Sequence, residues 1–390
     1  EGPIGPTWLS IGNRVERWGQ LDMLSVVDIL NGKDLRAGPL TPPELLRIPT
    51  PMLHLQLPLW NANSSYGSLE MSLLPFGASD RVSLIGSDWA LLKPGMLESL
   101  VEDMEQWEGD PLTEDFLQQG IQSLGGLLSQ VSPQAEGELG SLLAAQSSSG
   151  RPGSDTDLAL KLAAALGRHD VALMAAWMRN RQPNPQLDPV LASFIREEQL
   201  PGLAEQDAIL DALSTGISID RPRTWMLGAE FSSWLGPIGL RAETSWIQQK
   251  TFATPWMGTV ERPELGAAVG LDWVNGSTLA LFAEGSWRTI LNPPDDLWLN
   301  TADHIQAGFG GQLSMWSDRV KVQPGVLWDV SFQEWMLRPA LSWRPSDSLQ
   351  MDLALLVVTA PEDAPRELPD AMTTSLGPLG YASDTDSLII

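Results

Sequence analysis

The stretch "LGAAVGLDWVNGSTLALFAEGSW", residues 265–287, decides the fold. Apolar residues alternate with small or acidic ones from Leu265 to Trp273, and after Asn275-Gly276 the alternation resumes as far as Trp287. Such alternation is the pattern of a β-strand, and Asn-Gly between two such runs is typical of a tight hairpin turn. The second face is too small for an ordinary solvated face and too charged for a core: it carries Gly266, Ala268, Gly270, Asp272, Ala280, Glu284 and Ser286.

The same alternation recurs along the chain. It runs with little interruption from residue 223 to residue 355, and residues 7–19 and 53–59 also have the pattern of strands. Residues 157–179 are rich in alanine, so a helix is the alternative there. We predict a hairpin instead, because turn residues lie in the middle of the segment, at 167–170, and period two is kept on either side.

Composition limits the classes of function. The 390 residues include 49 acidic and 24 basic ones, a formal net charge of −25, which argues against a nucleic-acid partner. There is no cysteine, as suits an oxidising envelope compartment, and no run of 18 apolar residues that could form a transmembrane helix. Seventeen tryptophans against two tyrosines fit either a core or an interfacial belt.

The lengths of the connections alternate along the chain. Short connections fall at 61–65, 167–169, 235–238, 274–277, 316–318 and 344–347, and long ones at 20–50, 77–155, 181–222, 250–262, 288–302 and 360–382, with a tight link near Phe332 as the exception. Short turns on one side and long loops on the other are typical of an outer-membrane barrel. We therefore predict an all-β, up-and-down antiparallel transmembrane β-barrel of about 14 strands (range 12–18) that forms a single domain over residues 1–390.

The small and charged face is then the inside of the barrel, and the apolar face meets lipid. Strand-end tryptophans such as Trp177, Trp246, Trp287 and Trp343 would form the interfacial belt. The inward charges either pair across strands and hold the barrel's shape, or line a polar pore and select its solutes. The predicted pore-lining residues are His54, Glu70, Lys161, Glu230, Arg241, Glu243, Asp272, Glu284, Arg288, Lys321, Asp329, Arg338, Arg344 and Asp352.

Two of the long loops contain helical spacing. Within 77–155, apolar residues of 96–131 repeat at helical intervals, and within 181–222 helices are predicted from Asp188-Pro189 onward and over 209–213. We expect both loops to be extracellular. The stripe formed by Leu97, Leu100, Val101, Met104 and Trp107 would pack into an outer cap, narrow the pore or bind a partner, and neighbouring acidic residues would suit divalent cations shared with lipopolysaccharide.

The segment "IGNRVERWGQLDMLSVVDILNGKDLR", residues 11–36, resembles a poorly characterised family of Gram-negative outer-membrane, porin-like barrels. The resemblance rests on a Trp-Gly pair after an early strand and a following loop with Asp, Asn and Asp-x-Arg, namely Trp18, Gly19, Asp28, Asn31, Asp34 and Arg36. The chain differs from the family at Gln20, where an acid is usual, and at Gly32, where proline is usual. It also lacks the terminal aromatic residue of such barrels, so we expect residues beyond both ends. The resemblance implies passage of small molecules across the outer membrane.

No motif indicates covalent chemistry. His54, His169 and His304 lie at an inward position, a turn and a strand entrance, and nothing supplies a paired nucleophile or a metal-ligand spacing. We expect no enzyme activity, no metal and no cofactor. The predicted function is passive or gated passage of small solutes across the bacterial outer membrane, with lipid and lipopolysaccharide as surroundings. The alternative is a structural or docking barrel with a plugged lumen, whose acidic loops hold a protein partner or a second copy.

Overall fold

The computed structural model describes residues 2–4, 7–36, 46–62, 64–81, 108–109, 156–182, 184–197, 199–200, 203–215, 217–361, 377–379 and 387–389. Most of these residues form one antiparallel sheet of 17 strands, so the predicted all-β antiparallel class is confirmed. Two strands are interrupted, which leaves 15 positions across the sheet, within the predicted range. Among the described strands, β1 and β21 form the two edges, and no pairing joins them.

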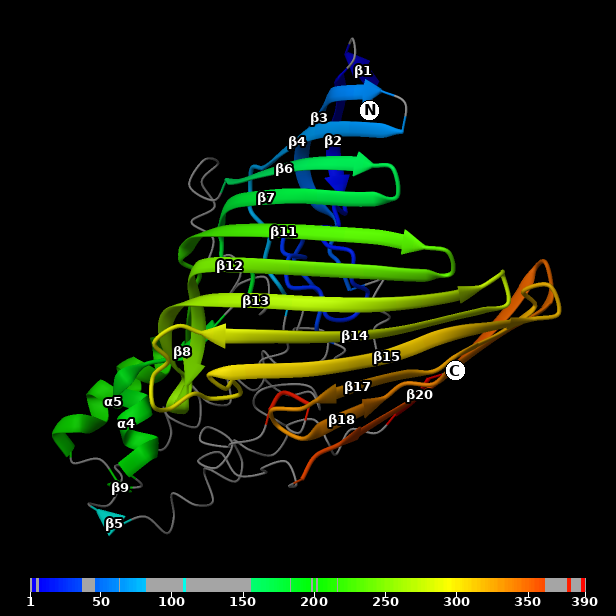
Figure 1. Ribbon diagram of the computed structural model, residues 1–390. Coiled ribbons are helices and arrows are strands. Elements are labelled where there is room, and N and C mark those ends of the chain that lie inside the picture. The colour runs from blue at the N-terminus through cyan, green and yellow to red at the C-terminus, as the bar shows by residue number, and fades with distance from the viewer. Residues whose placement is uncertain are drawn as a thin grey trace.

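The strands of the sheet follow the chain in order, each beside its neighbour in sequence (Figure 1). Their bounds are β1 (Gly2–Ile4), β2 (Thr7–Arg14), β3 (Thr50–Ala62), β4 (Ser65–Leu74), β6 (Asp157–Leu166), β7 (His169–Arg179), β11 (Arg223–Leu235), β12 (Ile238–Thr254), β13 (Gly258–Asn275), β14 (Leu279–Ile290), β15 (Asp303–Met315), β16 (Val320–Gln323), β17 (Gly325–Asp329), β18 (Glu334–Leu337), β19 (Ala340–Ser346), β20 (Leu349–Thr359) and β21 (Ser387–Ile389). The hairpin of residues 157–179 is confirmed.

Short hairpin turns gather at one end of the sheet, and the helices lie at the other (Figure 1). Helices α4 (Pro189–Glu197) and α5 (Leu203–Thr215) confirm the helical insert within 181–222; the small strands β8 (Asn184–Leu187) and β10 (Ile217–Asp220) pair beside them. A parallel pair joins β5 (Glu108–Gly109) to β9 (Gln199–Leu200). The helices predicted within 96–131 lie outside the described residues.

Three expectations about strand ends were wrong. The predicted long loop at 250–262 is mostly strand, because β12 and β13 continue past the other hairpins and only Pro255–Met257 connects them. The strand predicted over 7–19 ends at Arg14. The runs around Val320–Trp328 and Trp335–Trp343 each break at a proline, Pro324 and Pro339, because proline has no N–H to donate to the ladder.

One face of the sheet is apolar and exposed throughout. Its side chains are between 36% and 61% exposed and include Leu53, Leu73, Leu158, Leu160, Leu162, Leu173, Leu227, Leu240, Val269, Leu271, Leu281, Phe309, Leu341, Leu349, Met351, Leu353 and Leu355. Exposed tryptophans lie near both strand ends of this face, with Trp273, Trp316 and Trp343 beside the short turns and Trp225, Trp287 and Trp335 toward the opposite end. Trp177 and Trp246 are half-buried.

The buried core lies against the opposite, inner face. Its centre joins alanines and methionines of β6, β7, β11 and β13 to residues that precede β3, namely Trp18, Leu21, Val26, Val27 and Leu30. The blue trace of this segment passes behind the strands in Figure 1. The segment was predicted as the end of a strand followed by an outer loop, and that prediction was wrong, because the described part folds onto the inner face. No helix among the described residues is long and apolar enough to span a bilayer.

Candidate functional site

Residues 15–36, called the inner segment below, leave β2 and run across the inner face without regular secondary structure beyond two isolated bridges. Their apolar side chains anchor them: Trp18 is 2% exposed, and Leu21, Val27 and Leu30 are fully buried. They pack on Ala159, Ala172, Met174, Ala176, Met178, Met226 and Ala268 of the sheet. The burial of each large side chain contributes about 1.5–3 kcal/mol, so the inner segment is an integral part of the fold.

The small residues of the sheet leave room for this segment. A Cβ on Gly270 would lie 2.6 Å from Leu21 Cδ2, and one on Gly266 would lie 3.2 Å from Val26 Cβ. Both glycines belong to β13, where the alternation of small and apolar residues is strictest. The small face is therefore small because another part of the chain packs directly on it.

Glu243 of β12 is the principal anchor of the segment's backbone. One carboxylate oxygen accepts hydrogen bonds from the N–H groups of Gln20 (2.6 Å) and Leu21 (2.8 Å), and the other accepts from the Ser25 hydroxyl (2.7 Å) and the Val26 N–H (3.0 Å). The side chain is almost fully buried. Four donors around one buried carboxylate satisfy backbone groups that would otherwise lack partners.

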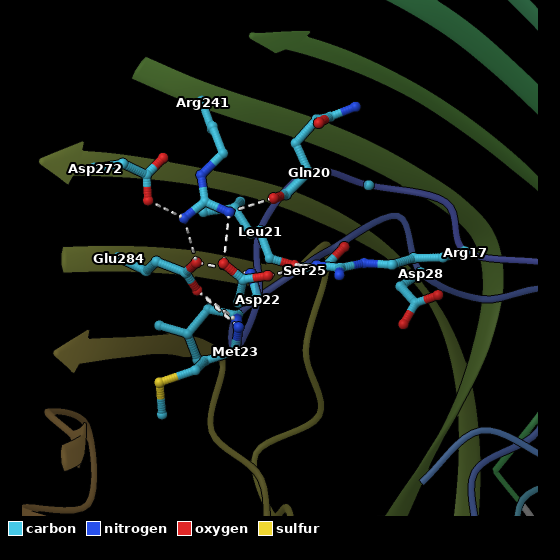
Figure 2. Close-up of polar contacts among 12 residues, drawn as sticks. Arg17, Gln20, Leu21, Asp22, Met23, Ser25, Asp28, Arg241, Asp272 and Glu284 are labelled. Atoms are coloured by element: carbon cyan, nitrogen blue, oxygen red, sulfur yellow. Dashed lines mark hydrogen bonds and ion pairs between the residues drawn. The ribbon is translucent and has the colours of Figure 1, made fainter. Parts of the chain in front are cut away.

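A second carboxylate repeats this arrangement. Glu284 of β14 accepts from the N–H groups of Asp22 (2.7 Å), Met23 (2.9 Å) and Leu24 (3.0 Å), as Figure 2 shows. It also accepts from Arg241 at 3.2 Å. Three consecutive N–H groups pointing at one carboxylate form a small anion-binding nest. Here the anion is a side chain of the same protein.

Arg241 lies at the centre of the charged cluster in Figure 2. Its guanidinium binds Asp272 at 2.6 Å and Asp22 at 2.8 Å, and it donates to the main-chain oxygen of Gln20. Glu230 of β11 completes the set of anchors. It pairs with Lys161 at 2.7 Å and accepts from the Gly19 N–H at 3.0 Å. The inner segment is thus held mainly by side chains of the sheet.

Two residues of the motif, Gly19 and Asn31, fix the backbone of the inner segment. Gly19 has φ +92, and a Cβ there would lie 2.3 Å from Ser25 Oγ and 2.7 Å from Glu243 Oε1, so only glycine fits. Asn31 is 3% exposed; it accepts from the Glu16 N–H and donates to the main-chain oxygens of Arg14 and Ile48. This amide therefore ties the end of β2 to the approach to β3.

Two aspartates of the motif bind arginines close in sequence. Asp28 accepts from Arg47 at 2.6 Å, and Asp34 accepts from Arg36 at 2.7 Å. The hydrogen bond from Arg36 is the largest influence on Asp34 and lowers the pKa of its carboxyl below the ordinary value. For Asp22, burial raises the pKa, but hydrogen bonds and charge from Arg17 and Arg241 outweigh it, so the net pKa is lowered.

Buried arginines hold the segment at the end of the sheet opposite the short turns. Arg181 donates to the main-chain oxygens of Ile29 (2.8 Å) and Ala78 (3.0 Å) and pairs with Asp157 at 2.5 Å. Arg221 also donates to Ala78 O, at 2.7 Å. Sequence reasoning missed this cluster, because the arginines follow strand ends and serve backbone carbonyls, which no motif marks.

The other predicted pore-lining residues share the inner face but differ in their surroundings. Asp329 is 1% exposed and binds His304 at 2.6 Å, while His54 is 2% exposed and contacts Ser72 at 3.0 Å. Glu70 and Arg288 are half-buried. Lys321 and Arg338 are also half-buried, and Arg344 and Asp352 are exposed. Whether these side chains line an open pore stays a prediction.

A second piece of chain is held in the same way. Glu334 of β18, fully buried, accepts from the N–H groups of Gly377 (2.6 Å) and Leu379 (3.0 Å). Sequence reasoning missed this carboxylate. In the part of the chain that is described, no group of three His, Asp or Glu side chains could hold a metal ion.

No protein-family model matches the sequence, and no curated protein matches it. Among solved structures the chain is similar to the outer-membrane channel DcaP of Acinetobacter baumannii (8% identity, 79% of this chain and 78% of that one, TM-score 0.31). It is also similar to the ferric enterobactin receptor PfeA of Pseudomonas aeruginosa (9%, 78% and 41%, TM-score 0.32) and the toluene transporter TodX of Pseudomonas putida (8%, 78% and 76%, TM-score 0.29). Likenesses this distant decide nothing about what this chain does.

Proposed function

We propose that this chain is an outer-membrane channel for small solutes, a β-barrel in which the inner segment forms the constriction. The observation that carries the proposal is the exposed apolar face with tryptophans at both strand ends. On β11, Trp225 and Leu235 are ten residues apart on the exposed face, and Leu235 pairs with Ile238, which in turn pairs with Trp273. At about 3.3 Å per residue and a tilt of about 40°, ten residues span about 25 Å across the bilayer, which matches the apolar band of about 25 Å in such barrels.

The inner face supports a channel rather than a barrel closed by its own wall. About eight strands already bring opposite walls into side-chain contact, and this sheet has 15 strand positions across. The remaining interior therefore needs either water or another part of the chain. The inner segment packs on β6, β7, β11, β12, β13, β14 and β15, and no contact joins it to β16, β17, β18 or β19 among the described residues.

Gated passage is favoured over a fixed filter by the way the segment is held. The N–H groups of residues 19–24 and 26 bind carboxylates of Glu230, Glu243 and Glu284 rather than a neighbouring strand, and Ser25 binds Glu243 through its hydroxyl. Side-chain anchors can release together without breaking the sheet's ladder.

A disulfide lock tests the gate. A Cβ on Gly266 would lie 3.2 Å from Val26 Cβ, near the spacing of about 3.5–4.5 Å in disulfides, and the native chain has no cysteine. In planar bilayers we expect the wild type to conduct and the Val26→Cys/Gly266→Cys variant to conduct less when oxidised than when reduced. The two single-cysteine variants should not respond to oxidant. Equal conductance of the locked and reduced forms would mean that the inner segment does not act as a gate and that the constriction is fixed.

Insertion into lipid is tested on neighbouring residues of β20. Leu353 is on the apolar face and is 42% exposed, whereas Asp352 is on the inner face. Leu353→Arg should prevent assembly in lipid, since a charge at the bilayer midplane costs about 2–4 kcal/mol. Asp352→Asn should assemble normally. Equal tolerance of both variants would contradict the membrane barrel.

The orientation is proposed from the two ends of the sheet, with the short turns in the periplasm and the helices outside the cell. On intact cells, a cysteine replacing Asp207 of α5 should react with an impermeant label, and one replacing Asn275 should not. The reverse result would mean that the barrel has the opposite orientation, with the short turns outside the cell.

The alternative is a structural or docking barrel whose interior stays plugged. It is favoured by the apolar core around Trp18 and Leu30, which is packed like the interior of a soluble domain. Such a barrel would present α4 and α5 to a partner and would carry no current. Absence of conductance in the wild type and in every variant would make this alternative the better proposal.

A further inference from the structure

We infer that the channel prefers small anions, because the accessible inner face of β16–β20 is basic even though the chain is strongly acidic; this inference rests on the proposed channel. The formal net charge is −25, and acids outnumber bases in the predicted inner row. Both facts would favour cations if every side chain of that row faced the solute. In the structure, however, most acidic side chains of the row are buried and several basic side chains are accessible.

Most acidic side chains of the predicted inner row are buried and bind other groups of the protein. Glu230, Glu243 and Glu284 are 4–7% exposed, beneath the inner segment, with their oxygens occupied by its N–H groups and by Lys161 and Arg241. Asp329, 1% exposed, is bound by His304 and by Gln306 at 3.1 Å. Carboxylates buried in this way are screened from a passing ion by the groups that they bind.

Three basic side chains of the row, which lie on strands away from the inner segment, have no carboxylate partner in the described part of the chain. Lys321 of β16, Arg338 between β18 and β19, and Arg344 of β19 make no ion pair with any carboxylate among the described residues. The Nε of Arg338 is buried without a hydrogen-bond partner, and Arg344 binds only the amide of Gln350, at 2.8 Å. These three residues are called the basic wall below.

The basic wall lies on neighbouring strands. Lys321 is opposite Ser342, and Ser342 is opposite Asp352, so Lys321 and Asp352 lie two strands apart, about 10 Å. Asp352 is the one exposed carboxylate of the predicted inner row on these strands, and it is bound by Gln350. Three cations therefore face one carboxylate. Fixed charges lining a narrow path set ion preference through their local field rather than through the charge of the whole protein.

Guanidinium and ammonium groups that bind no carboxylate of the protein suit carboxylates, phosphates and sulfates, which accept several hydrogen bonds at once. The expected solutes are therefore small organic or inorganic oxyanions, with chloride as the simplest probe.

The preference is measured as the reversal potential in planar bilayers under a KCl gradient. The wild type should show the sign of a chloride-preferring channel. Lys321→Glu/Arg344→Glu should shift the potential toward potassium, and the milder pair Lys321→Met/Arg344→Gln should shift it less in the same direction. The control is Arg196→Glu on exposed helix α4, which lowers the net charge by two, as the milder pair does.

The outcomes separate the preference from the channel itself. A potassium-preferring wild type, or a reversal potential that neither wall variant changes, would overturn the anion preference while leaving a channel. A shift as large in Arg196→Glu would mean that overall charge sets the preference and would also overturn it. Absence of current from the folded, heat-modifiable wild type would overturn the channel, and the preference with it.

Discussion

Replacing Glu243 by glutamine should loosen the inner segment while the sheet stays folded. The carboxylate accepts four hydrogen bonds, and glutamine keeps one acceptor oxygen for two of them. Its new NH2 group would face the Val26 N–H at 3.0 Å, and that buried donor would lose its acceptor at a cost of about 1–3 kcal/mol. The two retained bonds lose their charge assistance, which roughly halves their strength. The total is about 2–4 kcal/mol of local stability.

Amide hydrogen exchange of residues 20–26 in detergent measures this loss directly. A change of 2–4 kcal/mol should speed exchange of those amides roughly 30- to 700-fold, whereas the strand amides of β11–β13 keep their protection. The matched control is Glu261→Gln, an exposed residue of the same hairpin. Unchanged exchange at residues 20–26 would refute the idea that Glu243 anchors the segment. Equal acceleration of the strand amides would mean that the whole sheet had been destabilised.

Three further outcomes are expected from the same geometry. Gly19→Ala should prevent the segment from docking, because its Cβ would overlap Ser25 and Glu243, whereas Gly285→Ala, whose nearest neighbour would be 3.9 Å away, should be tolerated; protease sensitivity compares them. Asn31→Asp should cost about 2–4 kcal/mol, since a carboxylate would face carbonyl oxygens that now accept hydrogen bonds, and chemical unfolding in detergent measures it. The pKa of Asp22 is lowered by its arginines, so its stabilising contribution is complete above the ordinary aspartate pKa and is lost as the pH falls through the lower folded value. The protection factors of the neighbouring amides, which correct for the slower intrinsic exchange in acid, should therefore fall as the pH is lowered, and this acid dependence should be weaker in Asp22→Asn.

The sheet could be predicted from sequence because its signal is local. Period-two alternation with turn residues such as Asn275-Gly276 places both strands of a hairpin and both of their faces. The same rule found the hairpin of residues 157–179 and placed Asp352 and Leu353 on opposite faces. Strand ends were less predictable. The hairpin of β12 and β13 continues beyond the others because polar residues, which the pattern assigns to a loop, can pair in a strand that extends past its neighbours.

The inner segment could not be predicted, because the glutamates that hold its backbone are more than 200 residues away in sequence. Trp18 and Leu21 have no periodic neighbours, and nothing local indicates that Glu243 and Glu284 would bind the backbone between Gln20 and Val26. The motif resemblance did single out Trp18, Gly19 and Asn31, which the structure places at the anchors of the segment. It could not show that these residues are inside.

The inner face is too small for a solvated face and too charged for a core, and both properties have one physical cause. A solvated lumen needs no glycines, since water fills any space, whereas a packed segment requires the space that Gly266 and Gly270 leave. A backbone without regular structure then brings N–H groups into a buried place, and carboxylates are strong acceptors for them. Small residues and glutamates on one strand face therefore indicate a piece of chain docked there. Where that face instead carries Lys321 and Arg344 with amides, no described segment covers it, and the solute path is proposed along that surface.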